Sequence, residues 1–95
     1  MDMHFFALQV RTMAGWAPET IAYASCWMNY PTRDDAYARA KVLIADLGWH
    51  VEAVLEDHAL TGSSYSPDDE GLRYYEQALL DDEVIVFYVA QTPEN

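Results

Sequence analysis

The sequence is short of basic residues, of cysteine, of glycine and of long apolar runs. Five lysines and arginines stand against 16 aspartates and glutamates, so 95 residues carry a formal net charge of −11. A surface of this sign repels a phosphate backbone and lacks the attraction on which most binding to nucleic acids depends. We therefore expect no direct binding of DNA or RNA.

The scarcity of cysteine and of apolar runs bears on the compartment. Cys26, the lone cysteine, has no partner for an intramolecular disulfide, which agrees with a reducing environment. No segment approaches the ~18 consecutive apolar residues of a membrane span. The first residues, Met1 to His4, have neither the basic region nor the apolar core of a secretory signal. We expect a cytoplasmic protein that does not associate with membranes.

Motifs that carry catalysis or hold a cofactor are also missing. The four glycines are too scattered for a phosphate-binding loop or a dinucleotide fingerprint. Ser63, Ser64 and Ser66 lack the glycine-flanked turn of a hydrolase nucleophile. Cys26 has no adjacent histidine, lysine or arginine in the sequence, which is typical of a buried, unreactive thiol. We predict no catalytic residue and no cofactor.

Enough hydrophobic residues are present for one folded domain over residues 1–95, because they make up 52% of the chain. Residues 4–12 and 21–30 are rich in aromatic and branched side chains, and Gly15 and Pro18 lie between them. This pattern predicts a hairpin of two strands, with a packed loop around Trp16.

A helix is predicted to follow the hairpin, capped by Thr32 and ending near Leu47 before Gly48. Asp35 occupies the capping-box position, and an apolar stripe runs along one side of the helix. The stripe consists of Ala36, Ala40, Leu43, Ile44 and Leu47.

Three further elements complete the prediction. Residues 49–58 alternate as a half-buried strand, with Val51, Ala53 and Leu55 on the buried side. A second helix over 69–80, preceded by a cap at Ser66, should bury Leu72, Tyr75 and Leu79. The last strand covers 83–91, and a polar tail follows it.

The order strand, strand, helix, strand, helix, strand predicts an α/β fold of the α+β type. We expect a two-layer sandwich in which two helices cover one face of a small, four-stranded mixed sheet. Right-handed crossovers on one face tend to place the last strand at an edge.

That expectation conflicts with the composition of residues 84–90, a run without acidic or basic residues in a strongly acidic chain. Edge strands are normally charged or broken, because a bare edge pairs with other chains. Either the last strand is central, or a second copy of the protein covers it. In the second case Val84, Val86 and Tyr88 belong to a dimer interface.

One group of residues has the chemistry of a metal or proton-transfer site. His50, Glu52, Glu56 and His58 should share one face of the strand over 49–58, where they could ligate zinc, manganese or iron. Same-face neighbours lie roughly 6.5 to 7 Å apart, so Glu52 and Glu56 are about 13 Å apart and all four cannot meet one ion. A site would need help from another strand, for example from His4. An ordinary solvated face is the preferred interpretation, so no metal is predicted.

Three functions are compatible with these observations. The first is a small homodimeric protein-interaction module without catalytic activity, favoured by the bare last strand and by an aromatic content of 14% that exceeds the needs of a small core. The second is an acidic inhibitor or immunity-type protein that binds a basic partner. The third is a small metal-binding protein or enzyme that uses His50, Glu52, Glu56 or His58.

The charge imbalance predicts that salt stabilises the fold. Repulsion among 16 acidic residues is screened within a Debye length of about 10 Å at roughly 0.1 M salt. The melting temperature should therefore rise from low salt to a few hundred millimolar sodium chloride. A fall over this range would mean that attractive ion pairs outweigh the repulsion.

Overall fold

The structure, a computed structural model, describes residues 2–13 and 20–89. Its elements are β1 (Asp2–Thr12), β2 (Ile21–Tyr30), α1 (Arg33–Asp46), β3 (Trp49–Leu60), the short 3-10 helix η1 (Gly62–Ser64), α2 (Glu70–Asp81) and β4 (Glu83–Val89). The α+β class and the order of elements are confirmed. The predicted loop around Trp16 and the polar tail fall outside the described residues.

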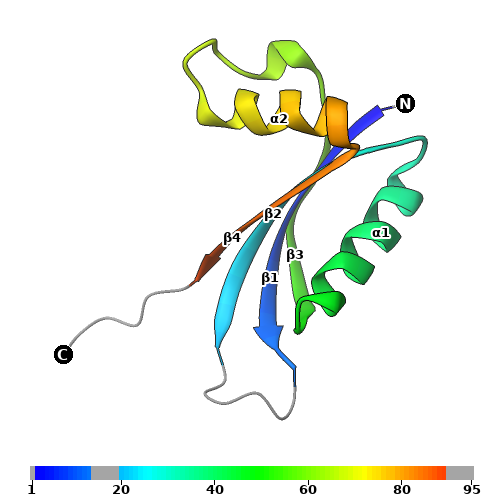
Figure 1. Ribbon diagram of the computed structural model, residues 1–95, viewed down its shortest axis with the longest axis vertical. Coiled ribbons are helices and arrows are strands. Elements are labelled where there is room, and N and C mark those ends of the chain that lie inside the picture. Colours follow the sequence, from blue (N-terminus) through cyan, green and yellow to red (C-terminus); the bar gives the residue numbers. More distant parts are fainter. Residues whose placement is uncertain (1, 14–19, 90–95) are drawn as a thin grey trace, which may run out of the picture.

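The sheet has the strand order β3-β1-β2-β4, and β1 and β2 form its centre. All three pairings are antiparallel, so the sheet is not mixed as expected. The connection through α1 joins two parallel strands, β2 and β3, but β1 lies between them, so no parallel neighbours arise. The connection through α2 joins the two edge strands across the whole width of the sheet (Figure 1). The last strand is therefore at an edge, and the alternative of a central position is wrong.

The two helices pack on opposite faces of the sheet, which differs from the expected arrangement on one face (Figure 1). Phe6 of β1 contacts Tyr37 of α1, with ring centroids 5.4 Å apart. On the other face, Trp27 of β2 contacts Tyr74 of α2, with centroids 4.9 Å apart. Because neighbouring side chains of a strand alternate between faces, Phe5 and Phe6 belong to different clusters.

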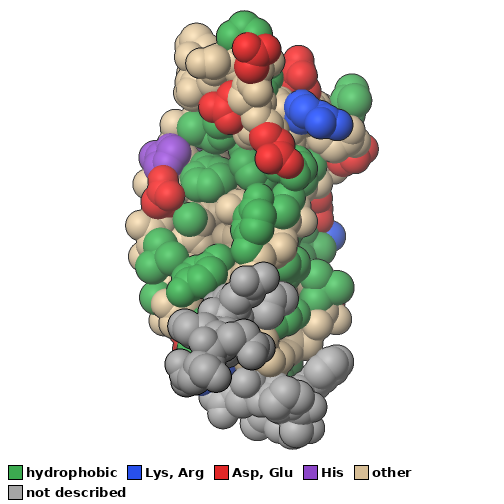
Figure 2. All heavy atoms as spheres, turned by 90° about the vertical axis from the view of Figure 1, so that its left-hand side faces the viewer, with side chains coloured by type: hydrophobic (Ala, Val, Ile, Leu, Met, Phe, Trp, Pro, Cys, Tyr) green, Lys and Arg blue, Asp and Glu red, His purple; other side chains and the backbone are tan. Residues whose placement is uncertain are grey.

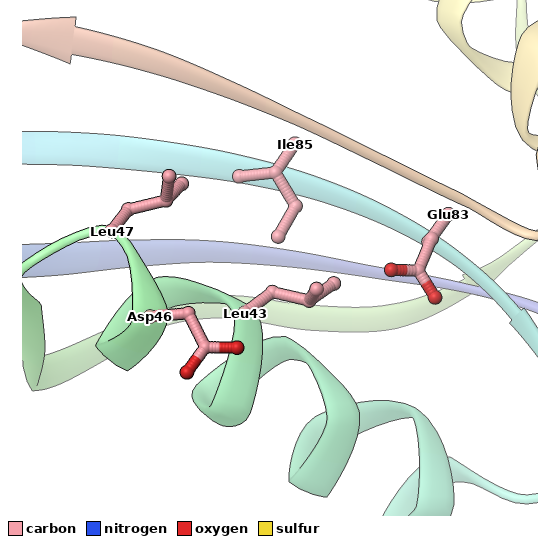
Figure 3. Close-up of a pocket in the computed structure, with 5 residues that line it drawn as sticks. All are labelled: Leu43, Asp46, Leu47, Glu83 and Ile85. Carbon is pink, nitrogen blue, oxygen red and sulfur yellow. The ribbon is translucent and has the colours of Figure 1, made fainter.

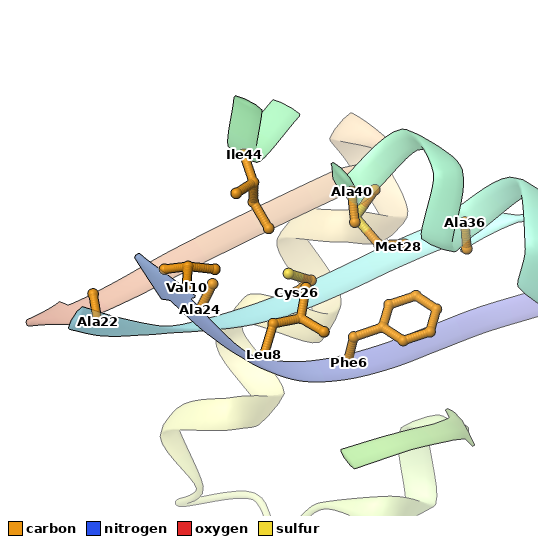
Figure 4. Close-up of a cluster of buried hydrophobic side chains, with 10 residues drawn as sticks. All are labelled: Phe6, Leu8, Val10, Ala22, Ala24, Cys26, Met28, Ala36, Ala40 and Ile44. Atoms are coloured by element: carbon orange, nitrogen blue, oxygen red, sulfur yellow. The ribbon is translucent and has the colours of Figure 1, made fainter. Parts of the chain in front are cut away.

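The main core lies between α1 and the sheet (Figure 4). Alternate residues of β1 and β2 meet the predicted stripe of α1, and small alanines allow the helix to approach the sheet closely. The fully buried members are Phe6, Leu8, Val10, Ala22, Cys26, Met28, Ala36, Ala40 and Ile44. The stripe is confirmed except at its end, since Leu47 is 57% exposed.

Local sequence signals explain where α1 begins and ends. The Thr32 side chain accepts a hydrogen bond of 3.1 Å from the backbone N–H of Asp35, so Thr32 caps the helix as predicted. Gly48 follows the helix with a φ of 92°, a conformation that glycine adopts at little cost. At the first turn, Arg33 pairs with Asp57 of β3 at 2.6 Å and ties the helix to the sheet edge.

The second helix departs from its predicted details. Its cap is Asp69, which accepts a hydrogen bond of 3.1 Å from the N–H of Gly71, and not Ser66. Ala78 is its buried residue, whereas Leu79 is 49% exposed. The helix lies across one end of the sheet, so most of this face of the sheet is not covered by α2 (Figure 1). None of the described helices is long and apolar enough to cross a membrane.

The core predicts a large cost for truncating the α1 stripe. Ile44 is fully buried, and Ile44→Ala should lower the free energy of unfolding by about 2 to 5 kcal/mol. Val42, on the same helix, is 49% exposed, and Val42→Ala should change it by less than about 0.5 kcal/mol. Urea denaturation of both variants tests this difference, and equal losses would show that α1 is not packed as described.

Candidate functional site

The free edge of β4 is the first candidate surface. The backbone N–H of Asn29 donates to the carbonyl of Asp82 at 2.7 Å, which marks these two residues as a hydrogen-bonded pair. Antiparallel pairing then alternates along the strand, so Val84, Val86 and Tyr88 direct their backbone groups toward β2. The backbone groups of Ile85 and Phe87 point outward. Among the described residues no strand pairs with this side of β4.

The opposite edge, β3, has a different character. Its pairing with β1 contains two register shifts, between Ala7 and Leu8 and between Gln9 and Val10, that mark β-bulges. Five ionisable residues lie along it, His50, Glu52, Glu56, Asp57 and His58. Bulges and charges are the usual means by which an edge strand avoids pairing with other chains. Between residues 84 and 88, β4 has no register shift and no acidic or basic residue.

Apolar surface lies beside β4 on both faces of the sheet. On the α2 side, Tyr23 and Tyr88 are cross-strand partners and are 40% and 51% exposed. Figure 2 shows hydrophobic side chains gathered over the sheet on this side. On the α1 side, Leu43 of α1, Leu47 directly after it and Ile85 of β4 point into a hollow of about 250 Å³ (Figure 3). Asp46 and Glu83 also line this hollow.

The bulges of β3 change the predicted alternation. Val54 pairs with Leu8 and faces α1, whereas Ala53 pairs with Gln9 and faces away from α1. Leu55, predicted to be buried, is 53% exposed because it falls at a bulge. Val51 and Ala53 therefore lie on opposite faces, so the predicted buried side is wrong. A bulge adds one residue to a strand without a reliable sequence signal, so the periodicity could not reveal it. The predicted common face of the polar residues is confirmed, since His50, Glu56 and His58 pair with Arg11, Ala7 and Phe5, which share one face of β1.

The four polar candidates of β3 do not act as one set. Glu52 accepts hydrogen bonds from Arg11 at 2.6 Å and from Gln9 at 3.2 Å. The hydrogen bond from Arg11 is the main reason why the pKa of Glu52 is lowered from its ordinary value of 4.5. This carboxylate therefore already has a cationic partner.

Glu56 and His58 form a separate pair, with 3.3 Å between a carboxylate oxygen of Glu56 and Nε2 of His58. His4, considered as a further ligand, cannot join them. It pairs with Ala59 and Met28, so its side chain lies on the α1 face, whereas His58 pairs with Phe5 on the α2 face. In the described part of the chain no three histidine, cysteine, aspartate or glutamate side chains form a group that could hold a metal ion.

A hollow of about 490 Å³ lies next to this pair. Strands β1, β2 and β3 line it from the sheet, and residues Ser64 and Tyr65 line it from the segment that precedes α2. We call it the aromatic groove. Its walls include Phe5, Ser25, Trp27, Glu56, His58 and Tyr65. The ring of Phe5 lies between those of His58 and Trp27, at centroid distances of 5.3 and 5.1 Å. The groove brings two of the four predicted residues together with aromatic side chains from β1, from β2 and from the segment between η1 and α2.

Tyr65 is fixed in the wall of the groove by several contacts. Its hydroxyl oxygen accepts a hydrogen bond of 2.9 Å from Nε1 of Trp27. Its ring contacts Tyr75, at 6.2 Å between centroids, and covers Gly71. A Cβ atom at Gly71 would lie 2.5 Å from the Tyr65 ring, so this close approach requires glycine. Sequence reasoning missed Tyr65 and Trp27, because their meeting depends on α2 packing opposite to α1.

Cys26 is part of the main core. It is fully buried, and burial raises the pKa of its thiol from 9.0 to about 12. The thiol therefore stays protonated near neutral pH, as expected of a structural cysteine.

In comparisons with protein-family models, curated proteins and solved structures, nothing matches this chain. The candidate surfaces therefore stand on their geometry alone.

The position of the β3 residues predicts the response to metal ions. Because Glu52 is held by Arg11 and His4 lies on the other face, zinc or manganese should leave the melting temperature of chelator-treated protein unchanged. Thermal unfolding at increasing metal concentration tests this. A saturable rise that His50→Ala or His58→Ala abolishes would establish a metal site on β3.

Proposed function

We propose that this protein is a small homodimeric interaction module, without catalytic activity of its own, whose copies pair through β4. The observation that carries the proposal is the contrast between the two edges of the sheet. Edge β3 is bulged and charged, whereas β4 is regular and has no acidic or basic residue from Val84 to Tyr88. An edge left bare in a chain that protects its other edge is suited to pairing.

A second copy is the partner that β4 fits best. Two antiparallel β4 strands can pair about a two-fold axis, so that each copy presents the same surface to the other. The outward backbone groups of Ile85 and Phe87 then find partners, and the two sheets of four strands become one continuous sheet. Val84, Val86 and Tyr88 contribute side chains on the α2 face of this interface.

Apolar surface on both sides of β4 supports the same pairing. The Leu43, Leu47 and Ile85 hollow borders the strand on one face, and Tyr23 and Tyr88 border it on the other. A second copy at β4 brings its own apolar side chains next to both surfaces. Burial of apolar area at the centre of an interface supplies most of its free energy.

Light scattering and sedimentation test the dimer directly. Wild-type protein should have twice the chain mass of 10.8 kDa at micromolar concentrations. Tyr88→Lys places a charge beside the free edge and should raise the dimer dissociation constant at least tenfold. Leu80→Lys makes the same charge change on a side chain of α2 that is 79% exposed, and it should leave the constant unchanged. A wild-type monomer at several hundred micromolar would refute the dimer.

Amide hydrogen exchange shows whether the dimer forms through β4 or through another surface. The N–H groups of Ile85 and Phe87 point outward, so their protection should increase with protein concentration. The N–H of Val86 bonds to β2 and should be protected at every concentration. Dimerisation with unchanged exchange at Ile85 and Phe87 would place the interface elsewhere.

A second candidate is binding of a basic protein, favoured by the charge around α2. Residues 68–82 contain six acidic side chains and one basic side chain, Arg73. Figure 2 shows acidic side chains around α2 with one basic side chain among them. Such a surface attracts a basic partner by long-range electrostatics.

Salt dependence separates the two candidates. Each copy carries −11, so salt screens the repulsion between two copies and should strengthen the dimer. Binding to a basic partner weakens with salt, because salt screens an attraction.

A further inference from the structure

The aromatic groove has the features of a small-molecule site. It encloses about 490 Å³, it is open to solvent, and rings form a continuous row along its floor. Within that row Phe5 contacts both His58 and Trp27. Pockets that bind small molecules typically combine such apolar walls with a few polar groups.

The polar side chains of the groove are the carboxylate of Glu56, the imidazole of His58 and the hydroxyls of Ser25, Ser64 and Tyr65. Glu56 has His58 as its hydrogen-bond partner among the described residues, and its side chain is 59% exposed. The oxygen of Tyr65 accepts the indole N–H of Trp27, which leaves the hydroxyl proton free to donate. Ser25 lies in the same wall. No lysine or arginine lines the groove.

The electrostatic environment of the groove is negative. Burial raises the pKa of Tyr65, the hydrogen bond from Trp27 lowers it, and the charges of Asp69 and Glu56 raise it further. Two carboxylates therefore place negative charge near this hydroxyl, and one of them, Glu56, lines the groove. A net charge of −11 adds to this field, which attracts cations and repels anions.

We propose that the aromatic groove binds a small organic cation, namely an amine that carries an aromatic or apolar body. Glu56 is the anionic partner of the ammonium group, and the row formed by Phe5 and Trp27 receives the apolar body. Ammonium groups are held by a carboxylate through charge-assisted hydrogen bonds and by aromatic faces through cation–π attraction.

The groove is built before any ligand arrives. Tyr65 is held by Trp27, by Tyr75 and by its close approach to Gly71. A wall that is already ordered loses little entropy when a ligand binds. Because the groove borders β3 and the proposed dimer forms at β4, both copies of a dimer keep an open groove. The two proposals can therefore fail independently.

Three matched probes test the chemistry: 2-phenylethylamine, the neutral 2-phenylethanol and the anionic 3-phenylpropanoate. Binding is followed through the Nε1–H resonance of Trp27 in ¹H–¹⁵N spectra. The amine should shift this resonance saturably and bind at least tenfold more tightly than the alcohol, and the anion should not bind. Equal binding of amine and alcohol, or binding of the anion, would overturn the assignment to a cation.

Substitutions test the site. Glu56→Gln removes the charge from an exposed side chain and should weaken binding of the amine at least tenfold. Glu76→Gln removes a charge from α2 outside the groove and should leave binding unchanged. Gly71→Ala displaces the Tyr65 ring and should weaken binding of the amine and the alcohol alike. Equal effects of Glu56→Gln and Glu76→Gln would mean that the amine binds the acidic surface in general, which refutes the groove as its site.

Discussion

The pairing of β1 with β2 is the constraint on which the rest of the structure depends. On one face of this pair the larger apolar residues of β1, Phe6, Leu8 and Val10, lie opposite small residues of β2, and α1 is the element that covers this face. Phe6 and Met28 need a closely packed helix above them, which the alanines of α1 allow. Once α1 is fixed on this face, the opposite face of the hairpin is left to α2, and α2 reaches only one end of it.

Partial cover of the second face explains both candidate surfaces. Where α2 and the segment before it meet the sheet, Trp27, Phe5 and Tyr65 form the aromatic groove with the Glu56–His58 pair. Where α2 does not reach, Tyr23 and Tyr88 remain exposed beside the bare edge of β4. Both surfaces thus belong to the face that α2 partly covers, with the groove bordering β3 and the bare edge at β4, and each has its own chemistry.

Charge has different effects at the two surfaces. At β4, repulsion between two copies opposes association, so apolar contact and backbone pairing have to exceed it. At the groove, the same negative field favours a cationic ligand. Among the described residues, Arg11, Arg33 and Arg39 pair with carboxylates of β3 and β4, and Arg33 also with Asp34 of α1, which leaves the acids around α2 largely uncompensated.

Local signals in the sequence determined the elements, since caps, glycine stops and apolar periodicity act over a few residues. Thr32 and Gly48 bound α1 as predicted, and the stripe through Ala36, Ala40 and Ile44 is buried. The absence of acidic and basic residues from 84–88 could also be read directly from the sequence. Local signals gave the wrong cap for α2, because two residues able to cap a helix lie close together in the sequence. The prediction took Ser66, whereas Asp69 caps the helix.

Only the tertiary structure decided the faces, the edges and the groove. Which face α2 covers depends on how a long connection crosses the sheet, and the bulges of β3 depend on its pairing with β1. As a result Leu55 is exposed, His4 and His58 lie on opposite faces of the sheet, and Tyr65 is hydrogen-bonded to Trp27. The physical reason is that such contacts join residues far apart in the chain, and their free energy belongs to the packed arrangement and not to any single segment.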